Sequence, residues 1–290
     1  MSFQAKLTSG EFVVLAEMDT PKGVDISDLV TNVRYLKSRV DAVVIPDLDN
    51  GVMHLGALAG GAVMRQQGME PLIHVCGRDK NRMALQADLL AAHVLGIHNL
   101  MVVKAEDMIN GDHPDAKTVD DLDDLGILAM IRSLTTGTDL AGFELRGKPD
   151  FLPGIAVPPI ADEAQLEEQV EDARSKVAAG ARYIMLQPVF DLAFYTLIIE
   201  AFATLHVPVI PSVFLLKNVG MARYISINDP GSRLSEDLIR RIRKAKDRDT
   251  ECIAIAGEMI RSLKGISRGI KISALGWEDR LPAILDSAGL

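Results

Sequence analysis

The feature that most constrains the fold is an alternation of short β-branched runs with longer segments of helical period. Parallel βαβ units produce this pattern, because each buried strand is followed by an amphipathic helix that returns the chain to the same edge of the sheet. The expected strands are Phe12–Met18, Asp41–Asp47, Pro71–Gly77, Leu100–Lys104, Gly154–Val157, Arg182–Gln187, Val207–Pro211 and Gly269–Leu275. Eight such strands predict an α/β fold, a single (β/α)8 barrel of the TIM type over residues 1–290.

The segments between these runs carry apolar residues at helical spacing. The expected helices are Ile26–Arg39, Leu55–Gln67, Asn81–Leu95, Asp123–Leu134, Glu163–Ala179, Leu192–Leu205, Ser235–Lys246, Glu251–Leu263 and Glu278–Leu285. Gly96 and Gly180 follow two of them, where glycine commonly ends a helix. The connection Glu106–Asp121 is polar and long for a barrel loop, which makes it a candidate functional segment.

The same alternation also fits an open, doubly wound sheet, which shares the βαβ signal. An open sheet of that kind normally carries a glycine-rich phosphate loop after an early strand. No Gly-x-Gly-x-x-Gly motif follows an expected strand, and Gly56, Gly60 and Gly61 fall within or beside a helix. The sequence therefore favours the closed barrel.

Composition narrows the class of protein. With 48% hydrophobic and 24% charged residues, the chain has the balance of a globular protein with a buried core. Its formal net charge of −9 disfavours nucleic acid and anionic membranes as partners. We expect neither an export signal nor a membrane helix, since no window reaches the roughly 18 apolar residues that a membrane helix needs. Cys76 and Cys252 form no C-x-x-C pair, so a cytoplasmic location without disulfides or structural zinc is expected.

Polar residues near the carboxyl ends of the strands are the first candidates for an active site, because barrel enzymes build their sites there. These residues are Glu17, Asp47, Asp49, His74, Lys104, Glu106, Asp107, Gln187, Asp191 and Ser273. Asp112 and His113 have no defined metal-ligand spacing, so no metal site is predicted. No serine or cysteine stands in a nucleophile elbow, so covalent catalysis has no support.

Glu17 stands out because it lies between Ala16 and Met18 in an otherwise apolar strand. Burial there is expected to raise the pKa of the carboxyl group and to make Glu17 a proton donor near neutral pH. The alternative is that a barrel lysine or arginine pairs with Glu17 for structural reasons. His74 also has apolar neighbours, and it fits a satisfied core histidine as well as a cofactor contact.

Several short motifs follow one another in a characteristic order. They are Phe12–Glu17, Pro71–Cys76, Gly96–Leu100, Lys104–Asp107, Gly111–Pro114, Asp120–Asp123, Lys176–Ala181, Leu186–Asp191, Ile210–Asn218 and Met221–Arg223. Their order and spacing resemble the methylenetetrahydrofolate reductase family over nearly the whole chain, and Lys176–Ala181 followed by Leu186–Asp191 is the most specific match. The pair Gly111–Pro114 and Asp120–Asp123 resembles the short reductases of anaerobic one-carbon metabolism.

The resemblance implies a flavoprotein oxidoreductase that reduces 5,10-methylenetetrahydrofolate to 5-methyltetrahydrofolate in one-carbon metabolism and methionine biosynthesis. It implies Glu17 as the catalytic proton donor and Asp107 and Gln187 as contacts of the folate substrate. FAD is the implied cofactor, with FMN as the alternative. The implied cofactor contacts are His74, Lys104, Glu106, Asp107, Asp172, Arg174 and Lys176. These roles are chemically consistent, because a glutamic acid can open the folate ring while flavin carries the redox step.

The chain departs from the family pattern at positions that serve the cofactor and the electron donor. Ile45 replaces a threonine, and Val157 and Ala161 replace a tyrosine and a histidine that hold the adenine dinucleotide. Ile225 stands where an aromatic residue stacks on nicotinamide, and Met221 replaces a substrate-side glutamine. Only 4% of the residues are aromatic, so the chain has few substitutes for these stacking platforms.

These departures leave two hypotheses open. The first is the reductase, with NAD(P)H or a partner redox protein as electron donor and with an oligomer or a complex as the expected assembly. The second is a folate- or pterin-binding barrel subunit without flavin redox activity of its own, which would work with a methyltransferase or an electron-transfer partner. A visible spectrum of the pure protein discriminates between them, because only the first protein binds a coloured flavin.

Overall fold

Eight parallel strands close into a barrel in the computed structural model, which describes residues 1–290. The strands follow one another around the barrel in sequence order, and β8 pairs with β1 to complete the closure. They are β1 (Val13–Glu17), β2 (Ala42–Ile45), β3 (Pro71–Val75), β4 (Asn99–Val102), β5 (Leu152–Ala156), β6 (Ile184–Leu186), β7 (Val209–Phe214) and β8 (Gly269–Ser273). The predicted (β/α)8 barrel is therefore confirmed, and the open sheet is wrong.

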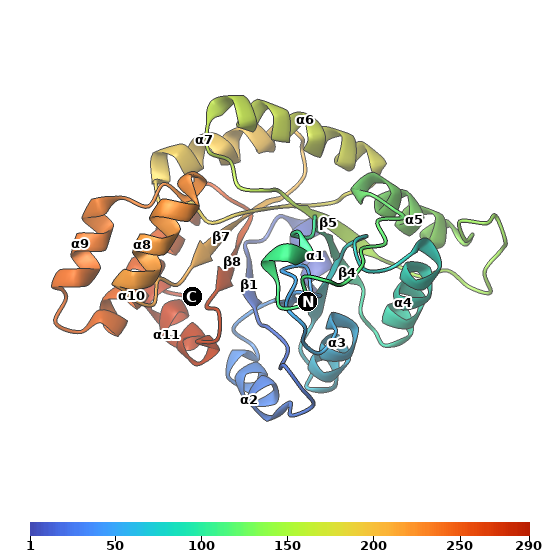
Figure 1. Ribbon diagram of the computed structural model, residues 1–290, viewed down its shortest axis with the longest axis horizontal. Helices are drawn as coiled ribbons and strands as arrows, with labels where there is room; N and C mark the ends of the chain where they lie inside the picture. The colour runs from blue at the N-terminus through green and yellow to red at the C-terminus, as the bar shows by residue number, and fades with distance from the viewer.

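Eleven helices pack on the barrel, α1 over one end and the others around it as an outer layer (Figure 1). They are α1 (Phe3–Ser9), α2 (Ser27–Leu36), α3 (Ala57–Gln66), α4 (Arg82–Val94), α5 (Asp124–Thr136), α6 (Glu163–Ala179), α7 (Leu192–Ala203), α8 (Val219–Asn228), α9 (Glu236–Lys244), α10 (Arg248–Leu263) and α11 (Leu281–Ala288), with 3-10 turns η1 (Met108–Asn110), η2 (Pro230–Ser232) and η3 (Glu278–Arg280). A large buried hydrophobic cluster joins the helices to the outer faces of the strands. None of the helices has the length and apolar character that a membrane crossing requires.

Side chains that point into the barrel form a second, smaller core. Strand residues alternate between its two faces, so Val13, Leu15 and Glu17 of β1 project inward in successive layers. Tyr183 is fully buried in this core, and its hydroxyl donates to the carbonyl of Leu100 at 2.7 Å. A Cβ at Gly154 would overlap the ring of Tyr183, so only glycine fits at that position. The barrel is therefore a packed core and not a pore.

α1 covers the amino-terminal end of the barrel, and in Figure 1 it lies at the centre of the barrel outline. Ser2 begins the helix by accepting from the amide of Ala5 at 3.2 Å, and Gly10 ends it with a φ of 79°. Phe3 is 0% exposed, and its ring meets Tyr183 edge-on with the centroids 5.7 Å apart. The sequence analysis does not predict α1, because seven residues are too few to show a helical period.

Three further differences from the expected elements concern the carboxyl-terminal rim and the end of the chain. α8 is not predicted, although Asn218 begins it by accepting from the amide of Met221 at 2.9 Å. β4 ends at Val102, so Lys104 lies in the loop after the strand and not at the end of it. The expected last helix begins as η3 and continues as α11 to Ala288.

Candidate active site

A cavity of about 870 Å³ opens at the carboxyl-terminal ends of β3, β4 and β5, beside α6. We call it the upper cavity. Its lining includes five of the seven predicted cofactor residues, namely Lys104, Glu106, Asp107, Asp172 and Lys176. Small-molecule and cofactor sites commonly enclose about 300–1,000 Å³, so the upper cavity is large enough for a flavin.

Lys176 anchors the α6 side of the upper cavity. It is 8% exposed, and its Nζ donates to Asp124 Oδ2 at 2.6 Å and lies 2.9 Å from Asp172 Oδ2. Burial alone would lower the pKa of Lys176, but the two carboxylates outweigh it and the pKa is raised. Lys176 is therefore an ammonium ion at neutral pH, and it retains a third donor hydrogen for a ligand.

The loop after β4 supplies most of the accessible charges of the upper cavity, and Glu168 of α6 adds one more. Lys104 is exposed and lines the cavity without an ion-pair partner. Glu106 and Asp107 are also exposed, and Asp107 begins η1 by accepting from the amide of Ile109 at 3.1 Å. The cavity thus presents the free ammonium group of Lys104 for a phosphate, and the carboxylates of Glu106, Asp107 and Asp120 that can accept from pterin N–H groups.

Glu17 lies at the end of β1 and points into the top layer of the barrel. Its Oε2 accepts from Lys271 Nζ at 2.5 Å, and its Oε1 accepts from Ser273 Oγ at 2.5 Å, both on the neighbouring strand β8. The expected rise in the pKa of Glu17 is wrong. Burial acts in that direction, but the Lys271 ammonium and the Ser273 hydroxyl outweigh it, so the pKa is lowered. Glu17 instead forms an ion pair with a barrel lysine, which was the alternative considered in the sequence analysis.

His74 projects from β3 and is 7% exposed. Its Nδ1 is hydrogen-bonded to Asp49 Oδ1 at 3.1 Å. Burial would raise the pKa of Asp49, but His74 and the amide of Asp47 outweigh it and lower the pKa to about 2. His74 Nε2 is buried without a hydrogen-bond partner. Because an unsatisfied buried polar atom is costly, this nitrogen is available to a bound ligand.

Arg78 forms hydrogen bonds that link the loops after β2, β3 and β4 at the carboxyl-terminal rim. It is 6% exposed, and its guanidinium donates to the carbonyls of Leu48 at 2.7 Å and Glu106 at 2.6 Å and to Asp79 at 2.7 Å. Its own carbonyl accepts from the amide of Val119 at 2.7 Å. The loops after β2 and β4 are thereby fixed to the loop after β3. The sequence analysis does not single out Arg78, and an arginine just after the third strand is the only signal that could have found it.

Four predicted site residues do not line the upper cavity: Glu17 and His74, which project from β1 and β3, and Gln187 and Arg174. Gln187 follows β6, is half-buried and lines a small neighbouring cavity together with Pro158, which also lines the upper cavity. Arg174 has a side chain that is 53% exposed, and its Nε pairs with Glu171 at 3.1 Å. The structure therefore places Gln187 next to the upper cavity and leaves Arg174 on the exposed surface of α6.

The positions that depart from the family pattern do not line the upper cavity, although Val157 stands between the lining residues Ala156 and Pro158. Ile45 is 0% exposed and Val157 is 3% exposed, and neither side chain lines the cavity. Met221 and Ile225 lie on α8, beyond the loop after β7. The lining of the upper cavity contains no aromatic side chain, so a planar ring bound there would pack on aliphatic groups and backbone.

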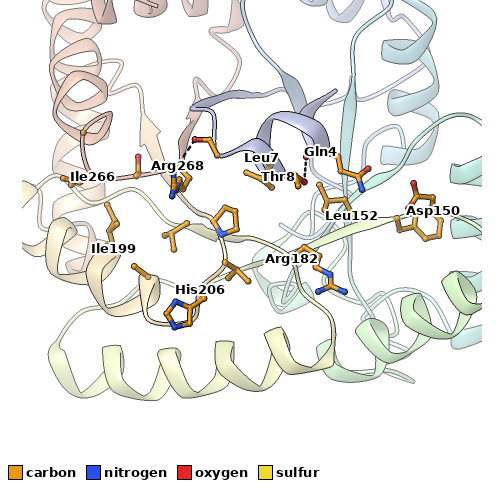
Figure 2. Close-up of a pocket in the computed structure, with 18 residues that line it drawn as sticks. Gln4, Leu7, Thr8, Asp150, Leu152, Arg182, Ile199, His206, Ile266 and Arg268 are labelled. Carbon is orange, nitrogen blue, oxygen red and sulfur yellow. Dashed lines mark hydrogen bonds between the residues drawn. The ribbon is translucent and has the colours of Figure 1, made fainter. Parts of the chain in front are cut away.

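A second cavity, of about 1080 Å³, lies at the opposite end of the barrel (Figure 2). Gln4 and Thr8 of α1 line it, together with Arg182, His206 and Arg268, which lie close to the amino-terminal ends of β6, β7 and β8. None of the predicted site residues lines this cavity. Because barrel enzymes carry their chemistry at the carboxyl-terminal ends of the strands, we assign the candidate active site to the upper cavity.

Comparisons with known proteins agree with this fold. The family model described as methylenetetrahydrofolate reductase matches residues 2–289. A solved structure described as a putative lyase/mutase from Burkholderia cenocepacia J2315 is similar with a TM-score of 0.52 and 11% identity, covering 99% of this chain and 85% of that chain. Tryptophan synthase from M. tuberculosis, in an open form with BRD0059 bound, has a TM-score of 0.49 and 12% identity, covering 99% of this chain and 96% of that chain. The first of these likenesses shows the fold alone, and no curated protein matches the sequence.

The closed barrel and its strand-end cavity define a (β/α)8-barrel protein with a candidate active site at the carboxyl-terminal rim. The chain belongs to the methylenetetrahydrofolate reductase family, since the family model matches essentially its whole length. Membership supports a methylenetetrahydrofolate reductase-type function, an oxidoreductase of folate metabolism. Members of the family generally bind a flavin.

Proposed function

We propose that this protein is a flavin-dependent oxidoreductase that reduces 5,10-methylenetetrahydrofolate to 5-methyltetrahydrofolate, with residues 1–290 acting as one barrel domain. The observation that carries the proposal is the carboxyl group of Glu17, which is held inside the barrel mouth at the end of β1. A carboxyl group at that place can exchange a proton with a folate bound over the mouth. Family membership supports the substrate class.

The upper cavity supplies groups that would hold the flavin. Lys104 and Lys176 would face phosphate groups, with Asp172 orienting Lys176, and Glu106 would accept from hydroxyl groups. His74, on β3 and outside the lining of the upper cavity, would offer its unpartnered Nε2 to the ring system. We favour FAD over FMN because the cavity, at about 870 Å³, has room for a dinucleotide. The bound flavin would supply the hydride. Arg174 is not among the residues that we propose to hold the flavin.

Three side chains would act on the folate. Glu17, once protonated, would give its proton to N10, which opens the five-membered ring and leaves a cationic N5 iminium that can accept a hydride. Asp107 would accept from the pterin N–H groups and stabilise the developing positive charge. Gln187, half-buried beside the upper cavity, would donate and accept at the edge of the pterin.

The electron donor would be NAD(P)H or a partner redox protein. The upper cavity offers no aromatic platform for a nicotinamide ring, which favours the partner protein. We propose that the protein works as an oligomer or as a subunit of a complex. The free, buried thiols of Cys76 and Cys252 fit a cytoplasmic location.

Anaerobic purification and reconstitution with FAD or FMN test the proposal, with folate reduction assayed from NADH and from an artificial dye. We expect a visible flavin band and formation of 5-methyltetrahydrofolate. Glu17→Gln should keep the band and lower kcat by at least about 10²-fold, the usual contribution of a positioned acid. Glu200→Gln, at an exposed position of α7, is the control and should be unaffected. Full activity of Glu17→Gln would reject the role of Glu17, and failure to retain any flavin would reject flavin dependence.

A second function is favoured by the ion pair between Glu17 and Lys271 and by the departures at Ile45 and Val157. In this function the protein is a folate- or pterin-binding barrel subunit without flavin redox activity, working with a methyltransferase or an electron-transfer partner. An ion-paired carboxylate can be purely structural. Such a protein would stay colourless after reconstitution and would still bind folate saturably.

A further inference from the structure

Lys271 enters the barrel interior from β8 and contacts Glu17 directly. Its Nζ lies 2.5 Å from Glu17 Oε2, and the two side chains are 9% and 14% exposed. The backbone of Lys271 pairs with Leu15 on β1, so the two charged groups come from adjacent strands of the closed barrel. Glu17 is the only acidic residue with which Lys271 forms an ion pair.

The other titratable groups near Glu17 come from three elements. His74 of β3 favours the charged form of Glu17 without bonding to it. Asp19, in the loop after β1, has a raised pKa, first because of burial and then because of repulsion by Glu17. Asp49, in the loop after β2, is bonded to His74. Lys271 is therefore the one countercharge in direct contact with the Glu17 carboxylate.

This contact opposes protonation of Glu17. A neutral Glu17 would leave the Lys271 ammonium enclosed in the barrel without its countercharge, which is unfavourable. Burial of Glu17 acts the other way, but the ammonium outweighs it and the pKa of Glu17 is lowered. A glutamate that serves as an acid near neutral pH normally has a raised pKa. The free protein thus holds Glu17 in the form of a base.

We propose that Lys271 is a positioning residue that holds Glu17 as a carboxylate in the free protein, so that the resting enzyme is set to take a proton from N10 of 5-methyltetrahydrofolate. This inference rests on the proposed function. In that direction a hydride passes from the N5 methyl group to oxidised flavin, and N10 attacks the iminium carbon. The N10 proton passes to Glu17 as the new N10–C bond forms. For reduction, Glu17 must first take up a proton from solvent.

The pH dependence of kcat/KM in the two directions reports the ionisation of Glu17 in the free enzyme. At any one pH the reaction equilibrium fixes the ratio of kcat/KM for reduction to kcat/KM for oxidation. The ionisation of Glu17 is therefore read from the pH at which each plot of kcat/KM against pH changes slope. In the wild-type protein, reduction should keep rising as the pH falls through the neutral range, and oxidation should stay level there. In Lys271→Met both bends should move to higher pH by about one unit or more, a tenfold change in the protonation equilibrium. Lys271→Arg should stay near the wild type.

The ionisation of Glu17 can also be read without cofactor or substrate, from the infrared carboxyl band that is missing in Glu17→Gln. The pH midpoint of this carboxyl band should rise by about one unit or more in Lys271→Met. Ser273→Ala removes a hydrogen bond but no charge and should give a smaller rise. Lys271→Gln also removes the charge, and it serves as the test if Lys271→Met does not fold. The control is Lys6→Met, which removes a lysine paired with Asp41 at 2.6 Å at the other end of the barrel. It should leave the band of Glu17 unmoved.

The outcomes separate this inference from the proposed function. An unmoved Glu17 midpoint in Lys271→Met, or in Lys271→Gln if Lys271→Met does not fold, overturns the role of Lys271. A shifted midpoint together with no folate turnover by the wild-type protein, from any donor, overturns the proposed function and with it the enzymatic use of the pair. A shifted midpoint with matching shifts of both pH profiles supports the inference.

Discussion

At the scale of single residues, the stability of the Glu17 carboxylate is set by two opposing effects. Removing a carboxylate from water costs several kcal/mol, and the Lys271 ammonium at 2.5 Å offsets that cost. Removing one partner of such a pair usually destabilises a protein by about 3–5 kcal/mol, because the other charge stays buried. Glu17 can relieve part of this cost by taking up a proton, so the penalty depends on pH.

Lys271→Met should therefore be less stable than the wild type at about pH 7 and should recover as the pH falls toward about 5. Without the ammonium, burial raises the pKa of Glu17, and a raised pKa gives stability that is lost as the pH rises. In the wild type the pKa of Glu17 is lowered, so its contribution is present above the unfolded pKa and is lost as the pH falls through the folded pKa.

Urea unfolding at several pH values between about 5 and 7 measures the free energy of unfolding of Lys271→Met and of the wild type. The double variant Glu17→Gln/Lys271→Met should lie closer to the wild type at neutral pH than Lys271→Met does, because it leaves no unpaired charge. If the free energy of unfolding depended on pH in the same way in Lys271→Met and in the wild type, the Lys271 ammonium would not offset the burial of Glu17.

The position of Glu17 could be predicted from the sequence, because a carboxylate in an apolar strand is a local signal. Its partner could not be predicted. Lys271 lies 254 residues away and meets Glu17 only because β8 closes against β1. The predicted rise in the pKa of Glu17 is wrong for this reason. The pattern of a strand shows that Glu17 is buried, but it does not show that Lys271 of a distant strand supplies a countercharge.

At the scale of elements, the loops after β2, β3 and β4 form one connected layer at the carboxyl-terminal rim. Leu48 has a φ of 61°, a conformation that costs an L-residue about 1–2 kcal/mol and needs outside support. Arg78 supplies part of that support through the carbonyl of Leu48. Gly51 and Gly111 allow the loops after β2 and β4 to touch, because a Cβ at Gly111 would overlap the carbonyl of Gly51. Asp112 pairs with Lys22 and thereby adds the loop after β1.

Arg78→Met should destabilise the protein by about 1–3 kcal/mol and speed hydrogen exchange at the amide of Val119, because the carbonyls of Leu48 and Glu106 lose their donor. The matched control is Arg82→Met, which breaks an exposed pair with Asp121 and should cost less than about 1 kcal/mol. Urea unfolding and amide exchange compare the two variants. Equal losses would show that Arg78 is not the link between these loops.

The strands and the longer helices could be predicted because their apolar period repeats over several turns. α8 could not be predicted, because only Ala222 is buried among its ten residues and its sequence shows no continuous apolar face. The loop after β4 could be predicted as a candidate functional segment, but its conformation depends on Arg78 and on the loop after β2. Such contacts between loops leave no periodic signal in the sequence.

At the scale of the whole molecule, the two ends of the barrel differ. α1 covers the amino-terminal end, where Phe3 and Leu7 complete the inner core, and the upper cavity opens at the carboxyl-terminal end. The closure of eight strands could be predicted from the strand count, and the general rule for barrels assigns the candidate site to the carboxyl-terminal end. The covering by α1 could not be predicted, because its residues become a core only beneath the assembled barrel.

Phe3→Ala should destabilise the protein by about 3–5 kcal/mol, because it leaves a cavity against Tyr183 in a closed core. Thr8→Ala, at an exposed position of the same helix, should have little effect and is the control. Urea unfolding measures both variants. Equal stability of the two variants would mean that α1 does not complete the inner core.

Single-turnover stopped-flow spectroscopy tests the role of Glu17 in folate reduction most directly. Flavin-reconstituted protein is reduced anaerobically and mixed with 5,10-methylenetetrahydrofolate, and the return of the oxidised-flavin band is followed. We predict a rapid return in the wild-type protein and a return at least about 10²-fold slower in Glu17→Gln at equal flavin content. A return at the wild-type rate in Glu17→Gln, or no folate-dependent return in the wild type, would contradict a proton-donating Glu17 in a folate reductase.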